Sequence, residues 1–561
     1  MADFRFKVLG LAALATLFAG VSFGQTTILS CAVATPVANP GPASLRAEGT
    51  TELTGDFQFS CNMSASAAVT AATITTFMSA PVTSKLLSTN TALTGPLTEA
   101  TLFLGSTNAL FTGAPPAATG ANTWAGGTFA SGIVTGNSIT FSGLTLPAGG
   151  APANTIYGRI ANIRVNANAV ALTSTLTSVT AQILASANAS SAATGSSSNV
   201  VGYVFKSLAA PAFTTYANNP TNTGAQINSY TTCAGNALPS TGTLAGPSFQ
   251  VTLAELVGGV KAFKTAVGDA GDSAAAGGGA GAVTTAGIGT LVSLNFGAVP
   301  TGVTLYVPLT VTDTTATHLL SMTLYSGGQV TTQPNLPTGA PAGYVPFTAS
   351  NGTVTLTYAV LATNPAALEA VNIPVFVSFS KNTFTTPQGP ITVLAGLGPQ
   401  APAASATTIP NFAPVTAPVL NATTISLCSS NLLFPFVTSA LGFDTGIALS
   451  NTSSDPFGTA QAPGTCALNF YGSGLPSPST GIAAPNGTQN GGTTNAFLLS
   501  SVAPGFTGYM IATCNYNFGH GFAYIVYNLT QNSGVSMGYL AEVLNPGATG
   551  RNISGSESNG Q

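Results

Sequence analysis

The regular alternation of apolar with polar residues is the feature that most constrains the fold of this chain. Its apolar members are Phe57, Phe59 and Cys61; Val303, Leu305, Val307, Leu309 and Val311; Val354, Leu356, Tyr358 and Val360; and Ile373, Val375, Val377 and Phe379. A period of two, with Thr prominent on the opposite phase, is typical of antiparallel strands that bury one face. The 64 Gly and 36 Pro residues separate these stretches as turns.

Helical periodicity is weak by comparison. The best window has Leu253, Leu256, Val257, Val260 and Val267 at helical spacing. Gly258 and Gly259 interrupt this window, and one interior Gly already costs about 1 kcal/mol relative to Ala. We therefore predict one short helix or an irregular crossover at this window. The predicted fold is all-β, with several antiparallel β-sandwich-like units.

The N-terminus has the features of an export signal. Arg5 and Lys7 precede an apolar run over 8–23, and Ser22 and Gly24 provide the small residues for cleavage before Gln25. The run is shorter than the ~20 residues that a membrane-spanning helix needs. We expect residues 1–24 to be removed and the mature chain, which has no other long apolar run, to be secreted, extracellular or on the outer cell surface.

Shifts in composition predict the domain boundaries. The segment 214–246 is polar and strand-poor, and 383–418 is rich in Pro, Ala and Thr, which is typical of an extended linker. The predicted organisation is an N-terminal β domain over 25–213, a polar connector over 214–246, a middle β-sandwich-like domain over 247–382, a linker over 383–418 and a C-terminal β domain over 419–561.

Charge is almost absent from this sequence. Asp, Glu, Lys and Arg make up 4% of the residues, against ~25% in ordinary soluble domains. The dispersed basic residues form no stripe that would bind nucleic acid. A near-neutral surface also repels copies of itself weakly and tends to associate. We expect no cofactor, and partners that are further copies of the chain, a cell-surface polymer or a glycan.

The even number of cysteines, six in an exported chain, predicts disulfides. Proximity favours Cys31 with Cys61 and Cys466 with Cys514. Cys233 and Cys428 would then form an inter-domain disulfide or remain free thiols.

Histidine, which hydrolases use as a general base, occurs only at His318 and His520. His520 lies in strand phase with Met510, Ala512, Cys514, Tyr516 and Phe518, which favours a hydrogen-bonded residue at the end of an apolar face. Asp444 or Asp455 could orient it in a Ser-His-Asp arrangement, but no GxSxG nucleophile elbow accompanies them. We therefore assign no catalytic residue.

Acidic residues are densest at Glu48, Glu52 and Asp56, beside Arg46. This cluster favours a local ion-pair network at a strand entrance over a calcium site or a catalytic carboxylate pair, because the EF-hand spacing is missing. Asp269 and Asp272 favour a solvated loop. We expect no metal site.

Trp124 is the only tryptophan of the chain and lies among turn residues. Exposed, it would be a candidate ligand platform for sugar rings; buried, it would be a core residue, which is the commoner role of aromatic side chains.

Several segments resemble a family of large exported bacterial proteins of uncharacterised function. They are LRAEGTTELTGDFQFSC (45–61), PVTSKLL (81–87), IYGRIANIRVNAN (156–168) and a C-terminal block that contains LLFPFVTSALGFDTGIALSN, TCALNFYG and MGYLAEVL. The resemblance implies a β-rich exported architecture and provides no catalytic residue.

These observations favour a secreted, non-enzymatic structural or adhesive surface protein that associates with itself. One alternative is an array of carbohydrate-binding modules, which predicts exposed aromatic residues on one sheet face. A further alternative is a secreted hydrolase that uses His520, which predicts this residue at a cleft beside an acid and a Ser.

Overall fold

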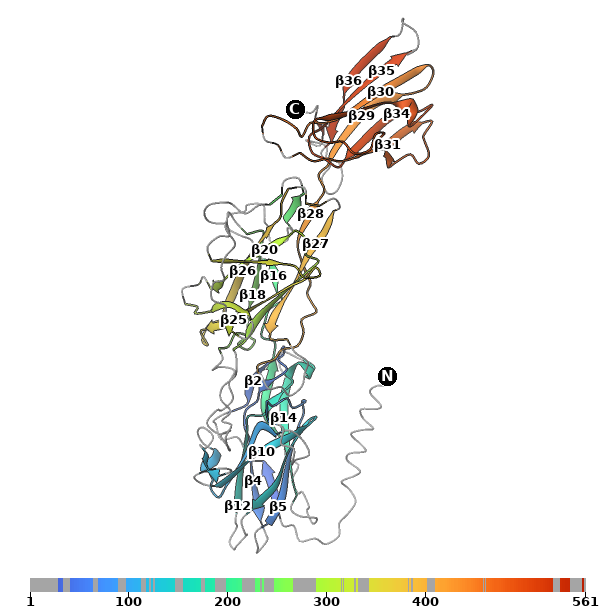
Figure 1. Ribbon diagram of the computed structural model, residues 1–561. Helices are drawn as coiled ribbons and strands as arrows, with labels where there is room; N and C mark the ends of the chain where they lie inside the picture. The colour runs from blue at the N-terminus through green and yellow to red at the C-terminus, as the bar shows by residue number, and fades with distance from the viewer. Residues whose placement is uncertain are drawn as a thin grey trace.

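The computed structural model shows three β units placed end to end (Figure 1). It describes residues 29–33, 41–63, 69–88, 97–111, 118–120, 123–124, 127–146, 155–172, 177–186, 198–213, 228–232, 235–236, 247–265, 289–313, 315, 317–326, 329–330, 343–381, 383–384, 387–400, 409–457, 459, 461–527, 535–544 and 557–558. Within these ranges there is no α-helix, and the short 3₁₀ turns are η1 (Asn108–Phe111), η2 (Ala167–Ala169) and η4 (Leu499–Ser501). The all-β prediction is confirmed. The signal segment 1–24 lies outside the described residues.

The N-terminal unit is one long, curled sheet with a small two-stranded ribbon. Its main strand order is β1-β4-β12-β7-β10-β11-β5-β14-β15-β2, and β3 pairs with β13. The strands are β1 (Leu29–Val33), β2 (Ala43–Arg46), β3 (Glu52–Leu53), β4 (Phe57–Met63), β5 (Val69–Met78), β6 (Leu86–Ser88), β7 (Leu97–Gly105), β8 (Ala118–Gly120), β9 (Thr123–Trp124), β10 (Gly127–Thr135), β11 (Ser138–Leu146), β12 (Thr155–Ala161), β13 (Arg164–Val165), β14 (Thr177–Ser186) and β15 (Ser198–Phe205). The alternating residues Phe57, Phe59 and Cys61 are all buried in its core.

The middle unit packs two sheets around one core, with strand orders β16-β18-β26-β20-β24 and β17-β28-β27-β19-β25-β22-β21. The strands are β16 (Ala212–Phe213), β17 (Asn228–Thr231), β18 (Phe249–Ala254), β19 (Leu291–Gly297), β20 (Thr304–Pro308), β21 (Thr310–Thr312), β22 (Ser321–Ser326), β23 (Gln329–Val330), β24 (Tyr344–Thr348), β25 (Val354–Ala362), β26 (Ala370–Ser378), β27 (Gln388–Gly398) and β28 (Leu420–Ser426). Alternation places the predicted apolar phase of β25 and β26 inside.

Two predicted boundaries are wrong. The predicted linker 383–418 contains β27, which lies between β19 and β28 inside the eight-stranded sheet. The predicted connector 214–246 contains β17, which pairs with β28. β17 and β27 therefore belong to the middle unit, because each pairs with strands of its eight-stranded sheet.

The predicted helical window is also corrected. Leu253 belongs to β18, in which residues alternate between buried and part-exposed positions. The chain then turns at Gly258, whose φ is +77°. A Cβ at Gly259 would lie 2.3 Å from the carbonyl oxygen of Lys206, so both glycines serve a turn with close backbone packing.

The C-terminal unit is a two-layer sandwich with strand orders β32-β31-β34-β29-β37-β38 and β33-β30-β35-β36. The strands are β29 (Ser430–Thr438), β30 (Phe443–Asn451), β31 (Cys466–Ser473), β32 (Ile482–Ala483), β33 (Thr493–Leu498), β34 (Thr507–Cys514), β35 (Gly519–Tyr527), β36 (Ser536–Leu540), β37 (Glu542–Leu544) and β38 (Glu557–Ser558). Within the described part of the chain, no helix has the length and apolar content needed to cross a membrane.

Candidate functional site

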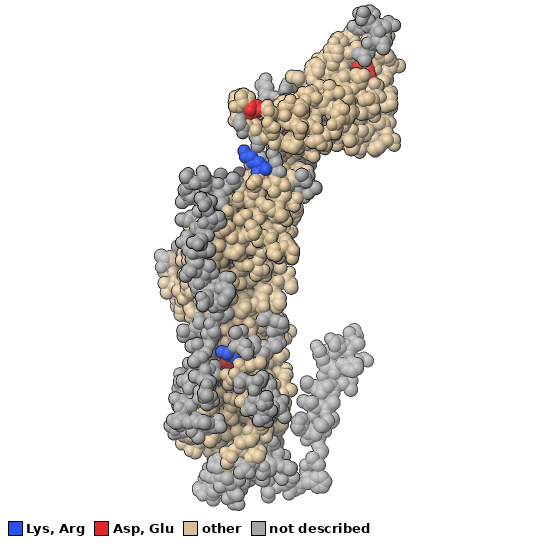
Figure 2. Space-filling model, in the orientation of Figure 1, with Lys and Arg blue, Asp and Glu red and all other residues tan. Residues whose placement is uncertain are grey.

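Nearly every charged side chain that the structure describes is buried or half-buried. Lys206 and Lys381 are the exposed exceptions among the described residues. Figure 2 accordingly shows a face made almost wholly of uncharged residues, with charged side chains at isolated points. Few charged groups of the described residues are therefore fully exposed to solvent.

Arg46, at the end of β2, joins the N-terminal and middle units. Its Nε donates to Oε1 of Glu52 at 2.8 Å, and both side chains are 2% exposed. Its Nη1 donates across the junction to the Ala262 carbonyl at 3.1 Å and to the Thr290 hydroxyl at 2.8 Å. The guanidinium lies 4.8 Å from the ring centroid of Phe412, which is a cation–π contact.

Further hydrogen bonds from side-chain and backbone groups strengthen the same junction. The Glu48 carboxylate accepts a hydrogen bond from the Ser207 hydroxyl at 2.7 Å. The Glu48 carbonyl accepts from the Ala413 amide at 2.9 Å, and the Thr50 amide donates to the Asn411 carbonyl at 2.9 Å. Residues 411–413 thus return from the middle unit to contact the N-terminal one.

Two further arginines are buried behind this junction. Arg164 Nε donates to Glu99 Oε1 at 2.7 Å, and the two side chains are 2% and 0% exposed. Arg164 Nη1 also donates to the Thr51 carbonyl at 3.1 Å. Arg159 pairs with Asp56. Each buried charge has an opposite charge beside it, as the cost of desolvation requires.

Three of the segments that carry the resemblance to exported bacterial proteins meet near this junction. The Thr83 hydroxyl donates to the Thr50 carbonyl at 2.7 Å, and the Arg164 amide donates to the Ser84 hydroxyl at 2.9 Å. β3 and β13 pair directly. The segments are 45–61, 81–87 and 156–168. Their polar residues therefore build one buried network.

Of the three acids in the predicted cluster, Glu52 and Asp56 form ion pairs with Arg46 and Arg159, and the Glu48 carboxylate accepts from Ser207. Burial by itself would raise the pKa of the Glu52 carboxyl, but Arg46 and Lys264 hold that pKa below its usual value of 4.5. No group of three His, Cys, Asp or Glu side chains suited to a metal ion occurs among the residues that the structure describes.

The middle unit has a second cluster of buried charge. Glu255 and Glu369 both pair with Lys261, the latter at 3.5 Å. The Glu255 carboxylate accepts from the amides of Ala262 and Phe263 at 2.8 and 3.2 Å. These contacts fix the turn that follows β18 against β26.

His318 belongs to a neighbouring turn. Its Nδ1 lies 2.7 Å from Oδ2 of Asp313. Burial alone would raise the pKa of Asp313, but backbone hydrogen bonds from Thr315 and Ala370, and the contact with His318, lower it. The carboxylate therefore holds a turn against β26.

The two disulfides expected from proximity are present. Cys31 and Cys61 are directly opposed on β1 and β4. Cys466 and Cys514 are directly opposed on β31 and β34. Each disulfide therefore joins neighbouring antiparallel strands within one unit.

Cys428 is also disulfide-bonded, so it is not a free thiol. It lies between β28 of the middle unit and β29 of the C-terminal unit. Cys233, its expected partner, lies outside the described residues.

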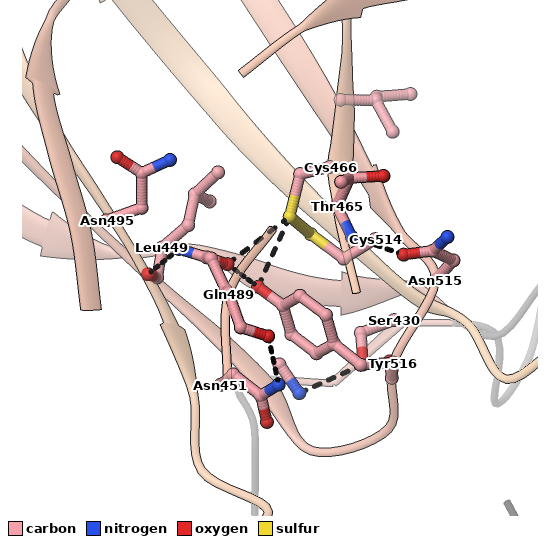
Figure 3. The surroundings of a disulfide bond; sticks show 12 residues. Ser430, Leu449, Asn451, Thr465, Cys466, Gln489, Asn495, Cys514, Asn515 and Tyr516 are labelled. Carbon is pink, nitrogen blue, oxygen red and sulfur yellow. Dashed lines mark hydrogen bonds between the residues drawn. A yellow bond between two sulfur atoms is a disulfide. The ribbon is translucent and has the colours of Figure 1, made fainter. Parts of the chain in front are cut away.

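Figure 3 shows the buried surroundings of the Cys466–Cys514 disulfide. The Tyr516 hydroxyl lies 3.2 Å from Cys466 Sγ and donates to Oε1 of Gln489. Gln489 Nε2 in turn donates to the Leu449 carbonyl at 2.9 Å. Burial raises the pKa of Tyr516 to about 12, so the hydroxyl remains a donor at neutral pH.

His520 is exposed and not at the end of an apolar face. The phase is reset in the turn between β34 and β35, where Phe518 has a φ of +59°. His520 is paired with Ser450 in the sheet, and Asp444 lies six residues from Ser450 along β30, about 20 Å at the rise of a strand. Asp455 accepts from the Phe457 amide in its own turn. Neither acid orients His520.

Two other predicted sites fall partly or wholly outside the description. Trp124 lies in β9, which pairs with β10, but its side chain is outside the described residues. Asp269 and Asp272 lie in 266–288, outside the described residues.

The outer face of the sheet β33-β30-β35-β36 presents aromatic side chains around a shallow groove. Phe522 and Tyr524 are 41% and 44% exposed, and their ring centroids are 6.5 Å apart with an interplanar angle of 19°. The small residues Gly446 and Ala448 lie beside them on β30, and Leu498 of β33 lines the opposite side. No charged residue lines this groove.

The opposite sheet of the same unit also exposes an aromatic pair. Tyr471 and Tyr509 are directly opposed on β31 and β34. Their rings are stacked with centroids 4.9 Å apart, and they are 40% and 41% exposed. Sequence reasoning named neither surface, because Trp124 was the one aromatic residue that it considered as a ligand platform. The available signal was the phase of Phe522 and Tyr524, which alternate with buried residues.

Comparisons with known proteins add no relative. No family model matches the chain, and no curated protein matches it. One solved structure with some similarity to this chain is Escherichia coli alpha-2-macroglobulin activated by porcine elastase. The TM-score is 0.13, with 10% identity over 92% of this chain. The match spans 34% of that protein. A likeness this weak supports no argument about function.

Proposed function

We propose that this chain is a secreted, non-enzymatic structural or adhesive protein that acts through an uncharged, β-rich surface. The observation that carries the proposal is the location of its charges. Arg46, Arg159 and Arg164 form ion pairs inside the fold. Among the described residues, all the exposed ones except Lys206 and Lys381 are neutral polar or apolar groups, which give little electrostatic repulsion between molecules.

Secretion is supported by the export signal over 1–24 and by the disulfides, which form and persist in oxidising compartments. Three units in line also suit a protein that must hold a contact surface away from its point of attachment (Figure 1). The C-terminal unit, with its exposed aromatic pairs, supplies the contact surface in this proposal.

Adhesion of beads coated with residues 25–561 tests the proposal. We expect the beads to aggregate with one another or to adhere to particles of a neutral polysaccharide. Because the surface has few charges, raising NaCl from 0.05 to 1 M should not release them, since salt screens only charged contacts. Beads that neither aggregate nor adhere, or that detach in salt, would contradict the proposal.

A carbohydrate-binding function is the second candidate, and the groove beside Phe522 and Tyr524 favours it. Aromatic rings next to a floor of Gly446 and Ala448 suit the apolar face of a neutral sugar ring. In this case Tyr524→Ala should weaken retention on a neutral polysaccharide column at least about tenfold, the usual scale for an aromatic anchor. The matched control is Phe457→Ala, which removes an aromatic side chain that is 89% exposed and lies outside both aromatic pairs.

A further inference from the structure

β36 is an edge strand whose outer side is open in the described part of the chain. It pairs with β35 alone. The Tyr527 amide donates to the Val535 carbonyl at 3.0 Å, and the Ala541 amide donates to the Gly521 carbonyl at 2.8 Å. In an antiparallel ladder bonded and non-bonded pairs alternate. The amides and carbonyls at positions 536, 538 and 540 therefore point away from β35.

Within the part of the chain that the structure describes, this edge lacks the protection that edge strands usually have. Natural edges are blunted by Lys, Pro, bulges or covering segments. The sequence of β36 is SMGYL, without charge or Pro. Val535, Met537 and Leu540 are 76%, 65% and 65% exposed.

β33, the other edge of the same sheet, has a neighbouring segment packed against it. On β33, Asn495 is buried and donates from its Nδ2 to the Pro485 carbonyl. Asn486 Nδ2 donates to Asn495 Oδ1 at 2.7 Å. Residues 485–486 thus lie against β33, whereas no described residue pairs with the outer edge of β36.

We propose that β36 pairs antiparallel with β36 of a second copy, about a two-fold axis at Gly538. The inference rests on the self-association that we propose for the function. The outward groups at 536, 538 and 540 are symmetric about Gly538, so Gly538 opposes itself and Ser536 opposes Leu540 of the other copy. Each such pair exchanges two hydrogen bonds, and a closed isologous dimer results.

Charge and shape favour a second copy as the occupant. In a self-paired dimer, β36 faces an identical strand. Because β36 has no charged residue, no like charges oppose each other across the pair. A Cβ at Gly538 would lie 2.6 Å from Cζ of Phe522, so the ring of Phe522 covers the glycine. The aromatic face would therefore run without interruption across the joined sheets of the two copies.

Sedimentation velocity of residues 25–561 over 1–100 µM tests the pairing. We expect a concentration-dependent dimer. The double variant Ser536→Lys/Leu540→Lys places Lys opposite Lys twice, and should weaken the dimer roughly tenfold. The double variant Ser536→Glu/Leu540→Glu should do the same. An equimolar mixture of the two variants should restore the dimer, because each Lys then opposes a Glu.

The matched control is Leu475→Lys, which adds a charge at an exposed leucine of the same unit, 49% exposed, outside β36. It should leave the dimer unchanged, and circular dichroism melts should confirm that all variants fold. A monomeric wild type, or a wild-type dimer that both double variants keep, would overturn the pairing. Bead adhesion that persists in either case would leave the proposed function standing, whereas a dimer without adhesion would reject only that function.

Discussion

The buried position of Glu52 explains how a chain with so few charges can use them. Glu52 is 2% exposed and is held by Arg46, which also reaches the middle unit. A buried pair contributes little net stability compared with an apolar pair, but removal of one partner strands the other charge. The ion pairs therefore hold particular segments of this protein together at fixed positions.

We predict that Glu52→Gln lowers the free energy of unfolding at pH 7 by about 3–5 kcal/mol, because Arg46 is left without its carboxylate. The pKa of Glu52 is lower in the folded chain than the usual 4.5. Its contribution is therefore full above pH 4.5 and is lost as the pH falls through the lower folded pKa. Urea denaturation should show a deficit at pH 7 that shrinks at pH 3.

The control for this measurement is Glu542→Gln, which removes the same charge from a half-buried position on β37. It should change the stability by less than about 1 kcal/mol, as surface substitutions generally do. A deficit for Glu52→Gln that is the same at pH 7 and pH 3 would show that the lowered pKa is not the source of the effect.

Among the elements, β27 shows most clearly what the sequence could and could not predict. Ile391, Val393, Ala395 and Leu397 are all buried and follow the same alternation as the strands that were predicted. The prolines that flank them outweighed this signal in the composition of 383–418. Alternation and the proximity of cysteines are local features, so strands and two disulfides were predictable. Which strands pair is non-local, and therefore the unit boundaries were not predictable.

β27 should resist proteolysis in the native protein. It lies between β19 and β28, and its backbone amides and carbonyls are bonded on both sides, so a protease must first unfold the middle unit. We expect brief proteinase K treatment to leave 388–398 uncut, with mass spectrometry as the readout. Early cleavage within 388–398 would indicate the extended linker that composition suggested. Heat-unfolded protein, cut at these residues, is the control for cleavability.

The two passages between units differ at the scale of the whole molecule. The first is crossed by Arg46, by Glu48 and by residues 411–413 returning from the middle unit. In the described part of the chain, the second passage is formed by residues 427–429, beside a crevice lined on one side by Phe384 and on the other by residues 462–465. A junction with buried polar contacts from several segments resists bending more than a junction formed by one connecting segment does.

We therefore predict a stiff stem of two units and a C-terminal unit that varies in direction. Class averages from electron microscopy of the wild type should show a narrow range of angles at the first junction and a broad range at the second. Arg46→Ala should broaden the first range and leave the second unchanged, because its contacts lie only at the first. Equal ranges at both junctions, or no effect of Arg46→Ala, would mean that the buried network does not set the stiffness. Such a stem would hold the aromatic faces and β36 of the last unit away from its own N-terminal unit, where another molecule can reach them.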